Sequence, residues 1–550
     1  MTRTTIAATT AAPRFRAPGP GSWQLDSAHV PRPWTRFQQE IHAPSLSAGF
    51  QAMTRRYGLL VDDLNWRFVE GFAYFSPRPA PEAEIPERLA AAERAFAERI
   101  WREDHQRWHA GLKPASIAAH RRLQAIDPTA LDTAALLNHL DRVRDHQRRM
   151  IQQHHRMNGA AFIPVGDFLS HAVEWTGLPG ATVLALARGS APQSAGDSPE
   201  LDRLVAALRA DAGARDVVEE DTPTEDALAR LRERPGEAGD AAREYLETVG
   251  HRLLDSLDVG DPTLLEVPDL IVRGLREALA GDARETGASD EAQVAAVRDR
   301  VPDAHRAQFD ELLAETRLTY GLRDERGIFS EVWAGGITRR VILTAGERLE
   351  AAGRIAEAAH LVEAGHAEMR GLIAGTGGPS ADELAARAVY RATHAAADAP
   401  ATIGDPPGPP PPLDGLPPAA ARGMRAIGTA IEALFAPSAA VSDARVVRGT
   451  GASAGRYTGI ARLLSGPAEL GRLRAGEVLV TPTTTEAFNV VLPLVGAIVT
   501  DAGGLLSHPA IVSREYGIPG VVGTLDATML IPDGALVEVD GAAGEVRVIR

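Results

Sequence analysis

The segment Asp501-Ala-Gly-Gly-Leu-Leu-Ser-His-Pro-Ala-Ile-Val-Ser-Arg-Glu-Tyr-Gly-Ile-Pro-Gly-Val-Val-Gly523 decides the fold of the C-terminal part of this chain. It follows the apolar run Ala497–Thr500, which predicts a strand. Glycines at 503 and 504 then let the backbone approach a ligand closely. A helix is expected from Ser507 to Tyr516. The segment therefore predicts a strand, a turn and a helix whose first turn carries a histidine.

That histidine, His508, lies where phosphate chemistry is favoured. The first turn of a helix offers unpaired N–H groups and the positive end of the helix dipole, both of which favour a phosphoryl group. A histidine there can attack a phosphate, hold it as phosphohistidine and release it to an acceptor. The alternative is that His508 merely caps the helix. We expect Gly503, Gly504 and Ser507 to support a phosphoryl group, whereas Arg514 either folds back to it or pairs with a neighbouring acid.

The segment lies in a region of short Val/Ile/Leu runs separated by glycine turns, which is typical of strands. Strands are expected at 445–448, 457–464, 477–481, 497–500, 520–522, 535–539 and 545–549. Residues 441–550 are therefore predicted to form a small β/α domain.

This region resembles the phosphohistidine domain of phosphoenolpyruvate-utilising enzymes. The resemblance rests on Gly503, Gly504, Ser507, His508, Ala510, Ile511, Arg514, Gly517, Ile518, Pro519 and Gly523, and it extends over about 444–550. It implies a swivelling domain that carries a phosphoryl group on His508. Leu506 stands where the family usually has Thr, which puts regulation through that hydroxyl in doubt. Pro509 replaces a common Ala, but proline is tolerated in a first helical turn.

Composition limits the possible functions. A chain of 550 residues with 44% hydrophobic and 24% charged residues is expected to form two to four soluble domains. Its net charge of −15 disfavours general nucleic-acid binding. Without cysteine it has no disulfide or thiolate metal site, which fits a cytoplasmic protein. No run of 18 apolar residues predicts a membrane span.

The rest of the chain divides into three expected parts. Residues 1–21 are predicted to be a flexible tail, and residues 22–398 a large, mainly α-helical substrate domain. Residues 399–440 form a proline-rich tether followed by a linker helix at Pro418–Phe435. The polar stretch from Ser190 to Asp240 is expected to contain an insertion. The predicted fold class is thus multidomain α plus α/β.

Three histidines of the helical body share one face of a predicted helix. His139, His146 and His154 interleave with apolar residues at spacings of three and four. They either form local hydrogen bonds in the interior, or His146 or His154 acts as a base toward an acceptor hydroxyl. Zinc binding is disfavoured by the seven-residue spacing, and no metal ligands are predicted.

A dense polar cluster follows another predicted helix at Tyr320. Arg323 is a candidate clamp for a transferring phosphoryl group, and Asp324 a candidate to orient the acceptor. The alternative is a solvated helix end. Arg339 has the same two interpretations.

The helical body shows no recognisable nucleotide site. It has neither a GxxxxGK[ST] loop nor the lysine-bearing hairpin that ATP-grasp domains usually use, and Lys113 is the sole lysine. The stretch Leu318–Glu325 and the stretches Ile337–Leu349 and Trp23–Trp34 resemble the substrate domain of rifampin phosphotransferase. In phenylphosphate synthase the histidine-bearing and ATP-binding parts are separate subunits. This resemblance implies ATP and Mg²⁺ bound mainly on a separate ATP-grasp partner.

We therefore expect a phosphotransferase subunit that transfers a phosphoryl group through His508 to a hydroxyl of a small organic acceptor. The resemblance favours a phenol or alkylphenol. A rifampin-type antibiotic acceptor is an alternative, and a non-catalytic phosphohistidine carrier or regulatory protein is another. Neither a nucleic acid nor a membrane is an expected partner.

Overall fold

The computed structural model describes residues 15–194, 196, 198–220, 223–254, 257–280, 291–409, 412–435, 442–443, 445–485, 488–489 and 492–549. Most of the predicted tail therefore lies outside the described residues. Its last part is packed, because the ring of Phe15 lies 6.0 Å from that of Phe72 and Gly21 donates a backbone hydrogen bond to Asp405. Within the described ranges, no helix is both long and apolar enough to cross a membrane.

The chain up to residue 398 is mainly helical, as predicted. Its helices are α1 (Arg36–Tyr57), α2 (Ile85–Glu98), α3 (Ile100–Arg107), α4 (Lys113–Gln124), α5 (Thr133–Arg156), α6 (Asn158–Thr176), α7 (Gly180–Leu184), α8 (Pro199–Ala210), α9 (Ala212–Glu219), α10 (Thr224–Glu233), α11 (Glu237–Val249), α12 (Pro268–Ala280), α13 (Glu291–Arg298), α14 (Arg306–Thr319), α15 (Leu322–Gly327), α16 (Trp333–Ala351), α17 (His366–Ala374) and α18 (Ala381–Thr393). Two π-helical turns interrupt these helices: Trp108–Leu112 joins α3 to α4, and Ile328–Val332 joins α15 to α16. The core lies mainly between α1, α5, α6 and α16.

Helix α5 begins where its cap predicts. Asp132 accepts a hydrogen bond of 2.7 Å from the backbone N–H of Ala135, which satisfies one free donor of the first turn. Its buried face includes Leu136, Val143 and Met150, at the expected helical spacing. His139 and His146 are buried on the same face, as predicted.

A small sheet was not expected in this helical region. Strands β1 (Ser22–Leu25), β3 (Arg67–Val69), β4 (Phe72–Phe75) and β6 (Thr402–Gly404) pair in the order β3-β4-β1-β6, and β2 (Val61–Asp63) pairs with β5 (Arg78–Pro79). Trp23 of β1 lies opposite Ile403 of β6. The beginning of the proline-rich segment is therefore fixed to the start of the chain.

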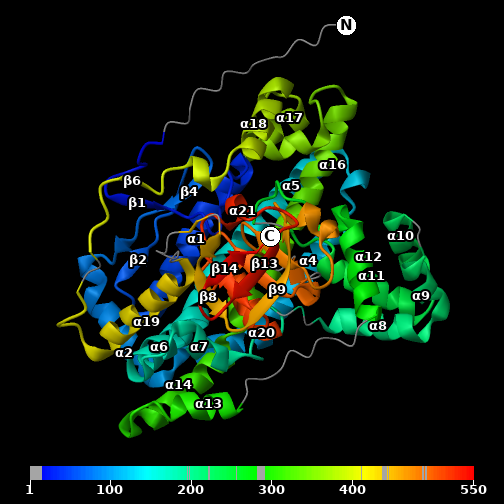
Figure 1. Ribbon diagram of the computed structural model, residues 1–550. Helices are drawn as coiled ribbons and strands as arrows, with labels where there is room; N and C mark the ends of the chain where they lie inside the picture. The colour runs from blue at the N-terminus through cyan, green and yellow to red at the C-terminus, as the bar shows by residue number, and fades with distance from the viewer. Residues whose placement is uncertain are drawn as a thin grey trace.

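The described residues of the stretch from Ser190 to Asp240, where an insertion was predicted, fold largely into α8, α9, α10 and the start of α11. These helices bury their own apolar cluster, which includes Leu204, Leu208 and Leu231. The cluster continues into the C-terminal domain through Leu479 and Phe488. Figure 1 shows α8 to α12 at one side of the molecule, with the C-terminal domain between them and the small sheet.

The C-terminal domain is the predicted mixed β/α unit. Its strands are β7 (Val446–Arg448), β8 (Thr450–Ser453), β9 (Arg456–Leu463), β10 (Val478–Thr481), β11 (Ala497–Thr500), β12 (Gly520–Val522), β13 (Leu536–Asp540) and β14 (Glu545–Val548). They form one sheet in the order β7-β14-β13-β9-β10-β11-β12-β8, in which β9, β10, β11 and β12 are parallel. Helices α20 (His508–Tyr516) and α21 (Ala527–Leu530) complete the domain. Only β8 lacks a counterpart among the predicted strands.

The linker helix α19 (Pro418–Phe435) has the predicted bounds but belongs to the helical body. It packs along α6, and a Cβ at Gly166 would lie 1.9 Å from the carbonyl oxygen of Ala426, so only glycine permits this approach. Arg422 of α19 forms an ion pair of 2.6 Å with Asp167. The linker helix is thus held against the helical body.

A buried histidine pair lies beneath α16. His146 and His120 are 3% and 0% exposed, and their rings are joined by a contact of 2.9 Å between Nε2 of His146 and Nδ1 of His120. Nε2 of His120 lies 3.1 Å from the carbonyl oxygen of Phe329, so it carries the hydrogen, and Nδ1 accepts from His146. Burial lowers the pKa of His120 to about 4 and that of His146 to about 3.

This pair predicts acid instability. Both rings stay neutral in the folded chain but gain protons below pH 6.5 when the chain unfolds, so stability falls as the pH drops from 6.5 toward 4. At pH 5.5 each ring costs about 1.4 kcal/mol. We expect the melting temperature to fall between pH 7.5 and 5.5, and to fall less in His146→Gln, because one titrating ring is removed while a hydrogen bond to His120 is retained.

The control variant is His109→Gln, which replaces a histidine outside the buried pair and should leave the contact between His120 and His146 intact. Thermal unfolding followed by circular dichroism at five pH values measures both effects. The same loss of melting temperature in His146→Gln and wild type would contradict the assignment.

Candidate functional site

The backbone around His508 is shaped by its two glycines. Strand β11 ends at Thr500, and Gly503 has a φ of +113°, which side-chain-bearing residues rarely adopt. A Cβ at Gly504 would lie 2.4 Å from the carbonyl oxygen of Ala433, near the end of α19. The same carbonyl accepts a hydrogen bond of 2.9 Å from the backbone N–H of Leu506. The double glycine therefore lets the histidine loop lie directly against the linker helix.

The ring of His508 is held by both nitrogens and is 6% exposed. Nδ1 lies 2.9 Å from the hydroxyl oxygen of Thr484, and Nε2 lies 3.2 Å from Oδ1 of Asn489. Burial lowers the pKa of His508 to about 4, with smaller opposing contributions from Asp324 and Arg323. The ring is neutral at physiological pH, and a neutral imidazole is the nucleophilic form.

His508 lines a cavity between the C-terminal domain and the helical body. The cavity has a volume of about 190 Å³, and much of its wall is apolar or aromatic. The apolar and aromatic lining residues are Leu46, Phe50, Leu64, Trp66, Phe162, Leu253, Leu257, Val332, Ile427, Ala430, Ile431, Leu434 and Phe435. Gly503, Ser507, His508 and Pro509 contribute the wall on the side of the C-terminal domain. A mostly apolar cavity with a few polar groups is typical of a site for an organic ligand.

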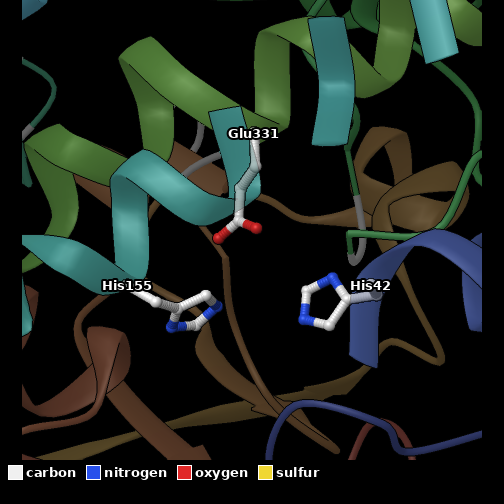
Figure 2. Close-up of side chains that lie close together, drawn as sticks. All are labelled: His42, His155 and Glu331. Atoms are coloured by element: carbon white, nitrogen blue, oxygen red, sulfur yellow. The ribbon is translucent and has the colours of Figure 1, made fainter. Parts of the chain in front are cut away.

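Three side chains converge in this cavity from separate elements. His42 comes from α1, His155 from the end of α5, and Glu331 from the π-helical turn before α16. One ligand atom of each lies within 4.8 Å of those of the other two, and Figure 2 shows both rings and the carboxylate pointing toward one another. Close packing of α1 on α5 makes this possible, since a Cβ at Gly49 would lie 2.3 Å from the carbonyl oxygen of Gln152.

This cluster is buried and incompletely bonded. Nδ1 of His42, Nε2 of His155 and both carboxylate oxygens of Glu331 are buried without a hydrogen bond. Nδ1 of His154 lies 2.8 Å from Oε1 of Glu331, which is within ion-pair distance but lacks hydrogen-bond geometry. Burial lowers the pKa of His42 to about 4 and holds those of His154 and His155 well below the usual value. The three imidazoles are therefore neutral.

Two further polar groups reach the cavity. Nδ1 of His29 lies 3.1 Å from both carboxylate oxygens of Asp26, which orients the ring as in a base with its supporting acid. Arg323 and Arg326 also line the wall, over the ring of Phe162. These groups give the cavity both hydrogen-bond acceptors and positive charge.

The structure brings together some of the residues predicted from sequence. His154 and Arg323 line the same cavity as Gly503, Ser507 and His508. Asp324 is fully buried beside Arg323, which donates a hydrogen bond of 3.1 Å to its carboxylate.

Other predicted residues have structural contacts elsewhere. Arg514 donates to the carbonyl oxygens of Ala452 and Leu505 and to the hydroxyl of Tyr320, at 2.6 to 3.0 Å. It therefore joins the two domains, and these contacts do not support a phosphoryl-binding role. His146 bonds with His120 as described, and Gly504 contacts the end of α19.

Arg339 likewise forms an ion pair with a residue outside the cavity. It forms an ion pair of 2.8 Å with Glu266 and donates to the carbonyl oxygen of Val259. Neither Arg339 nor His146 is among the cavity-lining residues.

The residues missed by sequence reasoning are His42, His155, Glu331, Thr484, Asn489 and the pair Asp26–His29 as a functional unit. They come from segments far apart in the chain, so no local spacing connects them. The buried stripe of α5 offered a partial signal, because His155 directly follows the predicted His154.

Comparisons with known proteins identify related regions in both parts of the chain. Residues 473–544 match the family model of the PEP-utilising enzyme mobile domain, and residues 153–324 match that of the rifampicin phosphotransferase fourth domain. The predicted resemblance is thereby confirmed for the C-terminal domain and for part of the helical body. His508 lies within the first match, and His154 and Arg323 within the second.

Several curated relatives share part of the chain. A probable phosphoenolpyruvate synthase of Archaeoglobus fulgidus is 43% identical over 101 residues, which cover 18% of this chain and 13% of that protein. The uncharacterized phosphotransferase YvkC of Bacillus subtilis is 42% identical over 101 residues, covering 18% and 12%. The chondramide synthase cmdD of Chondromyces crocatus is 46% identical over 114 residues, covering 21% and 3%. The chain thus spans only a small fraction of the length of these relatives.

The environment of His508 yields a testable consequence. At pH 6.0 a free histidine is about three-quarters protonated, whereas burial should keep His508 neutral. Histidine-labelled protein studied by NMR should show a neutral ring whose signals are missing in His508→Ala. Thr484→Val should move the Nδ1 signal because the hydroxyl contact is lost, and Thr484→Ser should restore it. A protonated ring at pH 6.0, or no change in Thr484→Val, would contradict the geometry.

Proposed function

We propose that this chain, with its mobile domain of the PEP-utilising type, is a phosphotransferase that transfers a phosphoryl group from His508 to a hydroxyl of a small organic acceptor. One observation carries the proposal: His508 of the C-terminal domain lines a largely apolar cavity to which the helical body contributes converging polar groups. A carrier read only by another protein needs no such cavity. An enzyme needs one to bind and orient its acceptor.

The acceptor class follows from the cavity. Its volume of about 190 Å³ exceeds that of an apolar protein cavity of about 150 Å³ that takes up benzene. Aromatic rings of Phe50, Trp66, Phe162 and Phe435 lie on its wall. A phenol or alkylphenol would place its ring among them and its hydroxyl at the polar groups. These features favour a phenol over a large macrocycle.

The proposed transfer uses residues on the cavity wall. His29, oriented by Asp26, takes the proton of the acceptor hydroxyl as its oxygen attacks the phosphorus on His508. The new O–P bond forms while the N–P bond breaks, and the electron pair of that bond returns to the imidazole. Arg323 stabilises the negative charge on the phosphoryl oxygens. With a phosphoryl group on Nε2, the Nδ1–H of His508 would donate to the hydroxyl of Thr484.

The phosphoryl donor is proposed to be ATP, bound with Mg²⁺ on a separate ATP-grasp subunit. The support is the resemblance to phenylphosphate synthase and the lack of a nucleotide motif in the sequence. In the proposed charging step, the β-phosphoryl group of ATP passes to His508 and water takes up the γ-phosphoryl group, leaving AMP and inorganic phosphate. The cytoplasm, where ATP is present, is the proposed location.

A rifamycin-type acceptor is the second candidate. It is favoured by the match of residues 153–324 to the rifampicin phosphotransferase fourth domain. A macrocycle would need a larger space than the cavity now offers, so we rank it below a phenol.

The carrier role is tested by intact-mass measurement of the purified chain with Mg²⁺-ATP and a candidate ATP-grasp partner. We expect an acid-labile phosphoryl adduct that requires the partner and is absent in His508→Ala. Adding phenols should discharge the adduct and produce an aryl phosphate, whereas a rifamycin tests the second class. No adduct with an active cognate partner would overturn the proposal, and labelling without any partner would place the nucleotide site in this chain.

The role of Arg323 predicts a separate effect. Arg323→Met should slow discharge of the phosphohistidine by an acceptor about 10²- to 10³-fold, because charge stabilisation in the transition state is lost. The amount of adduct formed should change little. Arg323→Lys should recover part of the rate, since it retains the charge without the guanidinium fork. Rapid-quench measurement of adduct decay checks this, and an unchanged decay rate in Arg323→Met would contradict the role.

A further inference from the structure

The cluster of His42, His155 and Glu331 is not explained by hydrogen bonding within the protein. His42 and Glu331 are 1% and 3% exposed, and the buried Nδ1 of His42 and both carboxylate oxygens of Glu331 form no hydrogen bond. Leaving a buried polar atom unpaired costs about 1 to 3 kcal/mol, and more for a charged group. With the buried Nε2 of His155, four such atoms lie at one place, which calls for a ligand that they share.

The chemistry of the donors identifies that ligand. Two neutral imidazoles and one carboxylate form a common protein ligand set of catalytic zinc, which leaves one position open. Two ligand atoms on one tetrahedral ion of this kind lie about 3.4 Å apart, so atoms within 4.8 Å of one another must approach by at most about 1.4 Å, through side-chain rotation, to close on it. Mg²⁺ prefers oxygen ligands and suits this set poorly.

We propose that His42, His155 and Glu331 bind a divalent transition metal, Zn²⁺ or an ion of similar ligand preference. The sequence analysis predicted no metal ligands, because the histidine spacing within α5 alone is unsuitable. The structure instead combines one histidine of α5 with a histidine of α1 and a glutamate of the π-helical turn. The amide of Asn158 lies 3.5 Å from Nδ1 of His155, which leaves Nε2 facing the cluster.

The position of the cluster gives the metal a role. All three residues line the cavity that contains His508, so a metal held by them would lie beside the proposed acceptor. This part of the inference rests on the proposed function: the metal would lower the pKa of the acceptor hydroxyl, which would then lose its proton more readily. His29 would take that proton, and the oxygen would form the bond to phosphorus as described above.

Metal binding is measured without reference to activity. Tag-free full-length protein is stripped with a chelator, dialysed and reloaded with Zn²⁺, and its metal content is determined by mass spectrometry. We expect one equivalent per chain, and a visible d–d spectrum of low coordination number when Co²⁺ replaces Zn²⁺. Mg²⁺ should not compete at a hundredfold excess.

Three ligand variants and one control variant make the test specific. His155→Gln and Glu331→Gln should each weaken Zn²⁺ binding by more than about 100-fold. Loss of a residue that only orients a metal ligand costs up to about 100-fold in affinity, and loss of the ligand itself costs more. His139→Gln, on the same helix α5 but outside the cavity lining, should bind Zn²⁺ like wild type. Thermal unfolding identifies any variant that fails to fold. Since His42 contributes from a different helix, His42→Gln gives an independent third measurement.

The outcomes separate this inference from the proposed function. His508→Ala should bind one equivalent of Zn²⁺ but take no phosphoryl group. A phosphoryl adduct in wild type with less than a tenth of an equivalent of metal would overturn the metal site alone. Stoichiometric Zn²⁺ that is retained equally by folded His155→Gln and Glu331→Gln would also overturn it. If the chain binds metal as predicted but never accepts a phosphoryl group, the metal site is supported and the proposed function is overturned.

Discussion

The arrangement depends on keeping the imidazole of His508 neutral and away from bulk water while two domains meet around it. Burial lowers its pKa to about 4, and Thr484 and Asn489 fix the ring by its two nitrogens. Two contacts hold the histidine loop in this buried position. Gly504 lets the loop lie against α19, and the side chain of Arg514 links the loop to Tyr320 of the helical body. A water-poor site strengthens electrostatic interactions and protects a labile phosphoryl group from hydrolysis.

Much of the fold was predictable from local patterns. The C-terminal strands, helix α20 and the linker helix α19 follow apolar runs and glycine turns whose signals lie within each segment. The small sheet was missed because β1 and β6 are short and are paired across most of the chain, and neither shows a strong strand pattern on its own. Strand β8 was missed for a similar reason, since its small residues Gly451, Ala452 and Ser453 resemble a turn.

The site was predictable only in part. A motif identified His508, and helical spacing identified His154. No sequence motif surrounds His42 or Glu331. The two residues come close together because α1 packs tightly on α5 and because Glu331 lies in a π-helical turn. Arg514 was predicted either to fold back to the phosphoryl group or to pair with an acid; its guanidinium is bonded to two backbone carbonyls and a tyrosine.

The packing of α19 on α6 has a kinetic consequence. Because this helix is held to the body, any movement of the C-terminal domain in the proposed cycle would leave α19 in place and would remove the wall that Gly503, Ser507, His508 and Pro509 help to form. The proposed acceptor would then enter through that opened side while the histidine is charged elsewhere. Return of the domain would enclose the acceptor with the phosphohistidine, so acceptor exchange and recharging would share one half of the proposed cycle.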